Sequence, residues 1–278
     1  MRLRVAAVQT GAYKGDYDAQ LANIARLVRS VAASGLVDVI CLPELMTTPY
    51  FARCRDAAWR DKAEPLADGP TYRYIAALAR EVRCAIVATC YERCGERRYN
   101  TAFIVRPDGS LAGRYAKTHI PYIEGVLAYE TLYFDPGPDL PVFDVMGIPI
   151  GILICYDRSF PEAWRTLALK GAQVIFVPTS SSGYRGELYA DELKVAAAQH
   201  QVFVVAANKA GAEVMAGAPG AITFYGKSRI ISPYGQIIAA LEREEDTFIV
   251  AKLDLAQVAA ARQALNYYRD RRQDLYML

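Results

Sequence analysis

Several short stretches of this chain are almost wholly apolar and lack the alternation of polar and apolar side chains that marks a half-exposed strand. Four of them are residues 2–10 (RLRVAAVQT), 37–42 (VDVICL), 150–154 (IGILI) and 202–207 (VFVVAA). Such runs are typical of β-strands that are buried on both faces. A sheet made of them needs a packed layer on each side, and this requirement predicts a layered α/β fold.

Helical stretches separate these runs. Residues 18–35 carry apolar side chains with a 3.6-residue period, and further helices are predicted at residues 71–83, 162–170 and 187–199. Each half of the chain thus runs strand, helix, strand, helix, strand, and then continues into antiparallel hairpins. We therefore expect a four-layer α-β-β-α sandwich of two mixed sheets, each covered by helices on its outer face.

The remaining segments are less regular. Residues 120–141 have no clear periodicity, and loops of that length inside a compact domain often line a functional site. A hairpin is predicted from residues 222–231 and 236–241, followed by a strand at residues 247–253. The basic, aromatic tail of residues 266–278 is expected to be irregular.

Composition argues against several classes of protein. The 278 residues are 53% hydrophobic and 22% charged, and the net charge of +2 gives no reason to expect binding to nucleic acid or to a membrane surface. No apolar run approaches the roughly 20 residues of a membrane helix, and no signal peptide is predicted. The 6 cysteines have no regular spacing, which favours reduced thiols in a cytoplasm and argues against a structural metal. Residues 1–278 are expected to form a single domain.

The central apolar run ends in a cysteine that is followed at once by polar residues. Cys155 comes directly after residues 150–154, and the segment from Ser159 to Glu162 has the form of a capping box that opens the next helix. Cys155 would then lie on a strand-to-helix elbow, near helix N–H groups and Arg158, and such surroundings stabilise a thiolate. A buried structural cysteine is the commoner alternative. The polar residues that crowd behind Cys155 argue against it.

Two other ionisable residues also stand where apolar strands stop. Glu44 follows the run at residues 37–42, and Lys117 lies near the end of the strand predicted at residues 111–119. Residues at strand ends can converge on one crevice although they are far apart in sequence. A thiol, a carboxylate and an ammonium can together perform acyl transfer, as nucleophile, general base and oxyanion partner. Taken singly, Glu44 and Lys117 are better explained by ordinary surface roles, and their spacing alone is weak support for a catalytic triad.

A family resemblance goes beyond these separate observations. The segments LPE ending at Glu44, RYAKTHIP around Lys117 and ICYDR around Cys155 resemble the three signature segments of the nitrilase (carbon–nitrogen hydrolase) superfamily, in the same order. The resemblance covers nearly the whole chain and implies an α-β-β-α sandwich. It also implies Glu44 as general base, Lys117 as oxyanion stabiliser and Cys155 as nucleophile, with no cofactor or metal.

The same resemblance implies two supporting groups. A second glutamate usually assists the lysine, and Glu130 in ETLYFDPG matches that motif better than Glu124 does. The backbone N–H of Tyr156 would be the other oxyanion donor. The expected reaction is hydrolysis of a non-peptide C–N bond through a thioester, with release of ammonia.

The substrate is less constrained than the reaction. Nitrilases carry Trp-Glu after the nucleophile, whereas this chain has Tyr156-Asp157, as amidases and N-carbamoyl hydrolases often do. Residues 155–165 (CYDRSFPEAWR) resemble the N-carbamoyl amino acid amidohydrolases most. Relatives that act on N-carbamoyl D-amino acids tend to have two adjacent arginines, one gripping the substrate carboxylate, but here Arg158 is followed by Ser159. We expect a small amide or N-carbamoyl (ureido) substrate, with Arg158 either binding substrate or forming an ion pair.

Other interpretations remain open at this point. The chain could be a nitrilase, a Cys-His hydrolase with His119 as base, or a scaffold without catalysis. The family uses its C-terminal end to clasp a partner subunit, which predicts a homodimer or a larger homo-oligomer, while a frayed terminus is the ordinary alternative for residues 266–278. Substrate-pocket residues are expected in 50–59, 120–129 and 180–189.

Overall fold

The strands form two mixed sheets in the computed structural model, which describes residues 1–13, 15–242 and 244–276. In the first sheet, β1 is parallel to β2 and β2 to β3, whereas the other neighbours are antiparallel. Its order is β15 (Thr247–Asp254), β1 (Arg2–Gly11), β2 (Val39–Cys41), β3 (Ala85–Cys94), β4 (Arg97–Val105) and β5 (Leu111–Ala116).

The second sheet repeats this mixed arrangement. Its strands β9, β10 and β11 are parallel, and antiparallel strands flank them on both sides. Its order is β14 (Ile237–Ala240), β13 (Arg229–Ile231), β11 (Phe203–Glu213), β10 (Val174–Thr179), β9 (Ile148–Ile152) and β8 (Val142–Val145).

The two sheets are connected through their central strands. β1 pairs with β11 in parallel over Thr10↔Lys209 and Gly11↔Ala210. Beyond this junction the far end of β11 pairs with β12 (Ile222–Tyr225). The junction lies at the carboxyl ends of the parallel strands, which is also the end where the predicted reactive residues lie.

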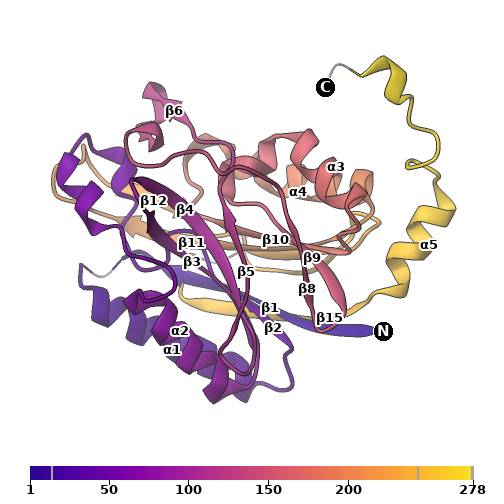
Figure 1. Cartoon of the computed structure of the whole chain (residues 1–278), viewed down its shortest axis with the longest axis horizontal. Helices are drawn as coiled ribbons and strands as arrows, with labels where there is room; N and C mark the ends of the chain where they lie inside the picture. The colour runs from indigo at the N-terminus through magenta and orange to yellow at the C-terminus, as the bar shows by residue number, and fades with distance from the viewer. Residues whose placement is uncertain (14, 243, 277–278) are drawn as a thin grey trace.

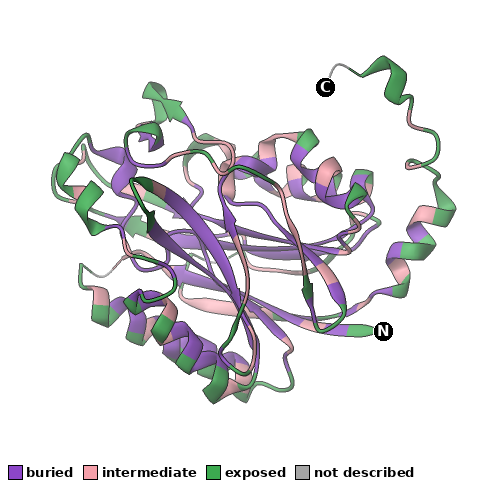
Figure 2. Ribbon diagram, viewed as in Figure 1, coloured by how far each residue is buried: buried purple, intermediate pink, exposed green. Residues whose placement is uncertain are grey.

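Helices cover the outer faces of both sheets, so the molecule has four layers (Figure 1). α1 (Tyr17–Ala33) and α2 (Pro70–Val82) pack on the first sheet, and α3 (Pro161–Leu169) and α4 (Gly186–His200) pack on the second. Figure 2 shows buried strands between helices that are exposed on their outer sides. The predicted α-β-β-α sandwich is confirmed.

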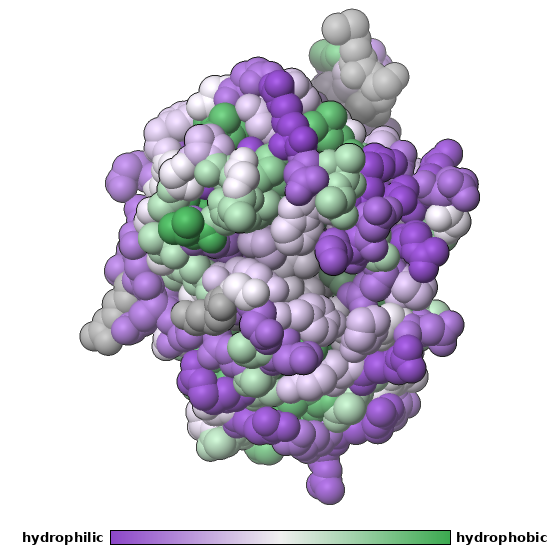
Figure 3. All heavy atoms as spheres, turned by 90° about the vertical axis from the view of Figure 1, so that its left-hand side faces the viewer, coloured by the Kyte–Doolittle hydropathy of each residue, from purple (hydrophilic) through white to green (hydrophobic). Residues whose placement is uncertain are grey.

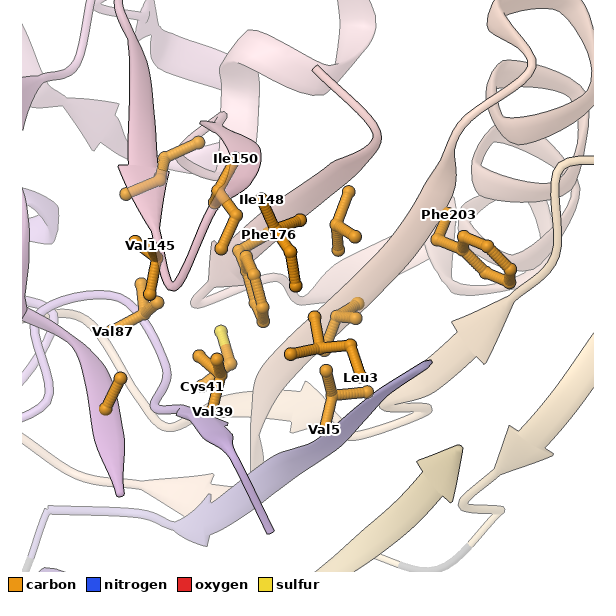
Figure 4. Packing of buried hydrophobic residues seen from close by; sticks show 14 of the residues in the cluster. Leu3, Val5, Val39, Cys41, Val87, Val145, Ile148, Ile150, Phe176 and Phe203 are labelled. Atoms are coloured by element: carbon orange, nitrogen blue, oxygen red, sulfur yellow. The ribbon is translucent and has the colours of Figure 1, made fainter. Parts of the chain in front are cut away.

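The inner layer explains why the strands lack polar alternation. Val5 and Ala7 of β1 point into the core between the sheets, whereas Ala6 and Val8 point toward the helices, and all four are buried. Figure 4 shows residues of the first sheet, such as Val39, facing residues of the second, such as Phe176. Each strand buries apolar side chains on both faces, against the helices and against the other sheet, and this removal of apolar surface from water stabilises both contacts.

Two local predictions are wrong. The strand predicted at residues 222–231 is broken by Gly226 and Lys227, which have φ of 62° and 58°, because β12 and β13 pair with different parts of β11. The capping box is absent, since α3 begins at Pro161 after a residue that makes no side-chain cap. Ser159 instead ends a 3-10 helix, and in the described part of the chain its hydroxyl has no hydrogen-bond partner.

The segment predicted to be irregular contains short elements. β6 (Tyr122–Ile123) and β7 (Ala128–Tyr129) pair as a small separate sheet. Seven 3-10 helices complete the element list of the described residues: η1 (Phe51–Arg53), η2 (Ala57–Lys62), η3 (Glu124–Val126), η4 (Glu130–Leu132), η5 (Cys155–Ser159), η6 (Gly183–Arg185) and η7 (Gln273–Leu275).

The C-terminal segment packs on the sandwich through α5 (Ala256–Ala264) and then extends along its outside (Figure 1). Val258 of α5 lies in the core between the sheets, and Gln201 Nε2 donates to the Ala261 carbonyl at 2.8 Å. Beyond α5, the Tyr268 hydroxyl donates to the His200 carbonyl at 2.7 Å. The last two residues of the predicted tail, 277 and 278, lie outside the described residues. None of the helices in the described ranges has the length and apolar composition needed to cross a lipid bilayer.

Candidate active site

Cys155 lies on the elbow between β9 and the 3-10 helix η5. Its φ of 46° falls in the left-handed region, which residues other than glycine seldom adopt, so the elbow holds the backbone in a strained conformation. Just before it, the Leu153 N–H donates to the Phe176 carbonyl of β10 at 3.0 Å and fixes the end of the strand. Tyr156 follows in the first turn of η5, where backbone N–H groups have no partner within the helix.

Asp157 fastens this elbow to the segment that carries Lys117. Its fully buried carboxylate accepts hydrogen bonds from the Ile154 N–H at 2.9 Å, the Tyr115 hydroxyl at 2.7 Å and the His119 N–H at 2.9 Å. The donors come from both sides of the sandwich, because Tyr115 and His119 flank Lys117 whereas Ile154 precedes the cysteine. No role was predicted for Asp157 from the sequence. Its position two residues after the candidate nucleophile could have suggested one.

His119 is engaged with the same carboxylate. Its Nδ1 lies 2.8 Å from Asp157 Oδ1, and its ring stacks on Phe160 with 3.8 Å between ring centroids. The charged groups that act on the Cys155 thiol are Glu44, Lys117, Arg158 and Glu130, as described below. The geometry therefore gives no support to a Cys-His pair.

Glu44 stands at the end of β2 with its carboxylate fully buried. Its Oε1 accepts from Asn100 Nδ2 at 2.7 Å and from Lys117 Nζ at 3.0 Å. Its Oε2 accepts from the Ser180 backbone N–H at 2.9 Å. Three donors, one from β4 and two from the residues directly after β5 and β10, thus hold the carboxylate in one orientation.

Lys117 lies between two carboxylates. Its Nζ is 3.0 Å from Glu44 Oε1 and 2.7 Å from Glu130 Oε2, and the Tyr50 hydroxyl donates to the other oxygen of Glu130 at 2.8 Å. Burial alone would lower the pKa of Lys117, but Glu130 and Glu44 outweigh burial and raise the pKa above its ordinary value. Lys117 is therefore a permanent cation at neutral pH. Glu124, by contrast, lies at the surface in an ion pair with Arg55.

The Cys155 thiol lies among these charges and is partly accessible. Its Sγ is 3.4 Å from the Ser181 hydroxyl and 3.7 Å from Arg158 Nη1. Burial raises the pKa of the thiol, as does Glu44, whereas Lys117 and Arg158 lower it. A nearby carboxylate that can accept the thiol proton and a nearby cation that favours the thiolate are the arrangement that nucleophilic cysteine chemistry needs.

Arg158 is paired within its own chain. Its Nε lies 3.3 Å from Glu192 Oε2, its Nη1 donates to the Cys155 carbonyl at 2.7 Å, and its guanidinium lies 5.0 Å from the Tyr189 ring centroid. The Arg158 side chain is 5% exposed. A substrate carboxylate would have to compete with Glu192 for this guanidinium.

The loops around the site contact one another. The Arg55 guanidinium lies 4.4 Å from the Tyr129 ring centroid and pairs with Glu124, so the connection between η1 and η2 is joined to the β6–β7 segment. Figure 3 shows this side of the molecule, where apolar and weakly polar surface lies among hydrophilic side chains. Exposed apolar side chains of the β6–η4 segment are Tyr122, Ile123, Val126 and Leu132.

Five polar residues around the catalytic candidates were not singled out from the sequence, although three of them lie in the predicted substrate-pocket segments 50–59 and 180–189. Each contacts a candidate, or a neighbour of one, through a strand or loop that is distant in sequence, so no local spacing could reveal it. They are Tyr50, Asn100, Ser180, Ser181 and Asn208. Within the described ranges, no group of three or more His, Cys, Asp or Glu side chains is placed to hold a metal ion.

Comparison with known proteins agrees with this geometry. Residues 4–263 match the family described as carbon-nitrogen hydrolase. The chain belongs to that family, and it is an enzyme that hydrolyses carbon–nitrogen bonds. The family and the reaction class predicted from the sequence are confirmed.

Individual relatives cover almost the full length. An N-carbamoylputrescine amidase from Solanum tuberosum is 34% identical over an alignment of 282 positions, which covers 98% of this chain and 93% of that protein. A nitrilase from Pyrococcus abyssi is 32% identical and covers 99% of both chains. Among solved structures, a carbon-nitrogen hydrolase from Helicobacter pylori G27 superposes with a TM-score of 0.91 at 25% identity, over 99% of this chain and 97% of that one.

Proposed function

We propose that this enzyme hydrolyses the terminal C–N bond of a small N-carbamoyl amine or amide and releases ammonia. The observation that carries the proposal is Lys117 Nζ, which lies 3.0 Å from Glu44 and 2.7 Å from Glu130 while its charge also acts on the Cys155 thiol. General base, cation and nucleophile are thus within reach of one carbonyl group.

The reaction would proceed in two halves. Glu44 takes the proton of Cys155, and the thiolate attacks the carbonyl carbon. Lys117 and the Tyr156 N–H stabilise the tetrahedral oxyanion, with Glu130 holding Lys117 in place. Protonated Glu44 then gives its proton to the leaving ammonia, and an acylated cysteine remains.

Glu44 next activates a water molecule that attacks the acylated cysteine. An amide substrate yields a carboxylic acid. An N-carbamoyl amine yields a carbamic acid, which loses carbon dioxide and leaves the free amine. In both cases the thiolate departs and recovers a proton, so Cys155 and Glu44 return to their starting states.

The surroundings of Arg158 favour a substrate without a carboxylate. Glu192 and the Cys155 carbonyl already occupy the guanidinium, and Ser159 stands where a second arginine would be needed. N-carbamoylputrescine, after which the Solanum tuberosum relative is named, is an N-carbamoyl amine. This is why we place N-carbamoyl amines before N-carbamoyl amino acids.

Ammonia release tests the proposal. We expect turnover of N-carbamoyl amines or simple amides, weaker turnover of N-carbamoyl amino acids, and no turnover by Cys155→Ala. Cys94→Ala, which changes an exposed cysteine, is the matched control and should keep full activity. Activity confined to nitriles would favour the nitrilase alternative, and a fully active Cys155→Ala would exclude the mechanism.

The proposal extends to assembly and location. A second copy of the chain would cover the extended C-terminal segment, whose exposed apolar side chains include Leu265, Tyr267, Leu275 and Tyr276. Light scattering should therefore report a homodimer or larger assembly, and removal of residues 266–278 should weaken it; a monomer would overturn this part.

The unpaired cysteines suit a reducing compartment such as the cytoplasm. We propose that residues 1–278 form one domain.

A further inference from the structure

Two consecutive serines at the end of β10 contact both the general-base candidate and the nucleophile candidate. The Ser180 N–H donates to Glu44 Oε2 at 2.9 Å, and the Ser180 hydroxyl donates to the Glu44 backbone carbonyl at 2.8 Å. The Ser181 hydroxyl lies 3.4 Å from Cys155 Sγ, within hydrogen-bond reach of a sulfur atom. The turn after β10 thus touches the two groups between which a proton must pass.

Asn208 of β11 fixes the backbone of Ser181 on both sides. The Ser181 N–H donates to Asn208 Oδ1 at 2.8 Å, and Asn208 Nδ2 donates to the Ser181 carbonyl at 3.3 Å and to the Gly226 carbonyl at 2.8 Å. Asn208 is fully buried, and its own N–H donates to the Ser228 hydroxyl at 3.0 Å. Because the backbone of Ser181 is held so firmly, its hydroxyl is directed toward the sulfur at little further entropic cost.

The charges around the sulfur explain why a neutral donor matters. Groups of both signs face Cys155 from several elements: Glu44, Glu130, Lys117, Arg158, Tyr50, Tyr189 and Tyr225. The carboxylates oppose formation of a thiolate, and Glu44 must stay ready to accept a proton. A hydroxyl group can stabilise the thiolate without adding a charge that would alter Glu44.

We propose that Ser181 is a further catalytic residue, whose hydroxyl donates a hydrogen bond to the Cys155 thiolate and orients the sulfur, with Asn208 as its positioning residue. This inference rests on the proposed role of Cys155 as nucleophile. Glu44 takes the thiol proton, and Ser181 keeps its own proton throughout. The same hydrogen bond stabilises the thiolate again when it departs from the acyl group.

Alkylation of Cys155 by iodoacetamide tests the inference without any substrate. The thiolate displaces iodide, so the rate follows the thiolate fraction as pH rises. We would use the Cys94→Ala background, which removes the exposed thiol, and follow the Cys155 peptide by mass spectrometry. For Ser181→Ala the midpoint of the pH profile should rise by about one unit, the size expected for loss of a hydrogen bond to a charged group.

Matched variants keep the test decisive if Ser181→Ala folds poorly. Ser181→Thr and Ser181→Val have nearly the same shape, and only the threonine keeps a hydroxyl, so the midpoint of the valine variant should lie above that of the threonine variant. Ser182→Ala removes a neighbouring hydroxyl and should leave the midpoint unchanged. Equal midpoints for Ser181→Thr and Ser181→Val, or an unchanged midpoint for Ser181→Ala, would overturn the inference.

Tyr225 provides a second control. Burial raises the pKa of the Tyr225 phenol, and both Arg158 and the Ser181 hydroxyl oppose that rise, so Ser181 could instead serve Tyr225. Tyr225→Phe should leave the alkylation midpoint near that of the parent protein. A shift as large as that of Ser181→Ala would assign the effect to the phenol and reject direct action on sulfur.

Turnover separates this inference from the proposed function. Ser181→Ala should lower kcat about tenfold and leave KM nearly unchanged, because the lost interaction is with the reacting sulfur and not with bound substrate. If the enzyme releases no ammonia from any amide or ureido compound, the proposed function fails. The alkylation profile still decides whether Ser181 stabilises the thiolate.

Discussion

Two lysines are completely buried near the carboxyl ends of the strands, and their surroundings differ in kind. Lys117 lies between the carboxylates of Glu44 and Glu130, which raise its pKa against the effect of burial. Lys209 donates to the Thr48 carbonyl at 2.9 Å and lies 5.6 Å from an aromatic ring centroid. Burial lowers the pKa of Lys209. Glu213 and Glu44 raise it, but by less than burial lowers it.

Tyr50 joins the two regions. Its hydroxyl donates to Glu130 Oε1 at 2.8 Å, and its backbone N–H donates to Glu213 Oε1, also at 2.8 Å. Burial, a lysine and a glutamate are therefore common to both regions, and these features alone do not define a reactive site. The difference is that the carboxylates around Lys117 also act on the sulfur proposed as the nucleophile, whereas Lys209 ties a loop to β11.

The largest difference in turnover should be between variants of the two glutamates, Glu44 and Glu213. Glu44→Gln removes the proposed base, and turnover should fall on the order of 10²–10⁴-fold. Glu213→Gln keeps the shape of a glutamate that accepts from the Tyr13 and Tyr50 backbone N–H groups, so turnover should stay near the wild-type value. Ammonia assays on both variants, with circular dichroism to check folding, test this contrast. Equal losses would mean that the two regions work as one.

The lysines should show a similar contrast. Lys117→Met removes the oxyanion partner and should lower turnover by about 10²–10³-fold. It also leaves two buried carboxylates without their cation, so its thermal stability must be measured alongside. Lys209→Met introduces a side chain of similar length at a lysine outside the proposed reaction centre, and the variant should keep most of the activity. A larger loss for Lys209→Met than for Lys117→Met would reverse our assignment.

Tyr50→Phe should sharpen the comparison, because it removes the contact with one region only. The phenylalanine loses the hydrogen bond to Glu130 and keeps the backbone contact with Glu213. We expect about a tenfold fall in kcat, the size of one hydrogen bond to a charged group. Tyr91→Phe is the control, since the Tyr91 hydroxyl donates to the Tyr133 carbonyl within the same aromatic cluster. Equal effects of the two variants would indicate general loosening of that cluster.

The smallest effects concern the pH dependence of the free energy of unfolding, to which the two lysines should contribute with opposite signs. The raised pKa of Lys117 stabilises the fold fully below the ordinary value of 10.5, and this contribution is lost as pH rises through the folded-state pKa. The lowered pKa of Lys209 makes stability rise with pH between its folded-state pKa and 10.5, because the unfolded chain binds the extra proton there.

Urea unfolding from about pH 7 to pH 10 measures this difference. The wild type should gain stability relative to Lys209→Met once pH rises above the folded-state pKa of Lys209, whereas its advantage over Lys117→Met should stay constant. A constant difference for Lys209→Met would show that burial does not disfavour its charge.

The layers of the fold were predictable because the sequence carries their physical cause. A strand such as β1 is apolar on both faces since one face packs on helices and the other on a second sheet. The break between β12 and β13 was not predictable from local pattern, because it depends on where each strand meets β11. The capping box failed for a related reason: η5 continues through Ser159, and Pro161 begins α3.

The site divides in the same way. Glu44, Lys117, Glu130 and Cys155 stand in motifs whose order along the chain could be matched. Their partners could not be found in this way, because Asn100 of β4 contacts Glu44 across the intervening strand β3, and Asn208 reaches the candidate site through Ser181. Such contacts follow from strand order and register, which local spacing does not encode. The roles of these residues remain predictions that the variants above can test.

The junction between β1 and β11 has a mechanical consequence. Main-chain pairing at Thr10↔Lys209 and Gly11↔Ala210 joins the sheets beside the residues proposed for chemistry, whereas further along the described part of the sandwich inner-core packing and hydrogen bonds to α5 hold the layers together. Motions that separate the two sheets should therefore be smallest next to Cys155, where the main chains are paired. Thermal fluctuations would widen the distal end first and leave the spacing of the reacting groups least disturbed.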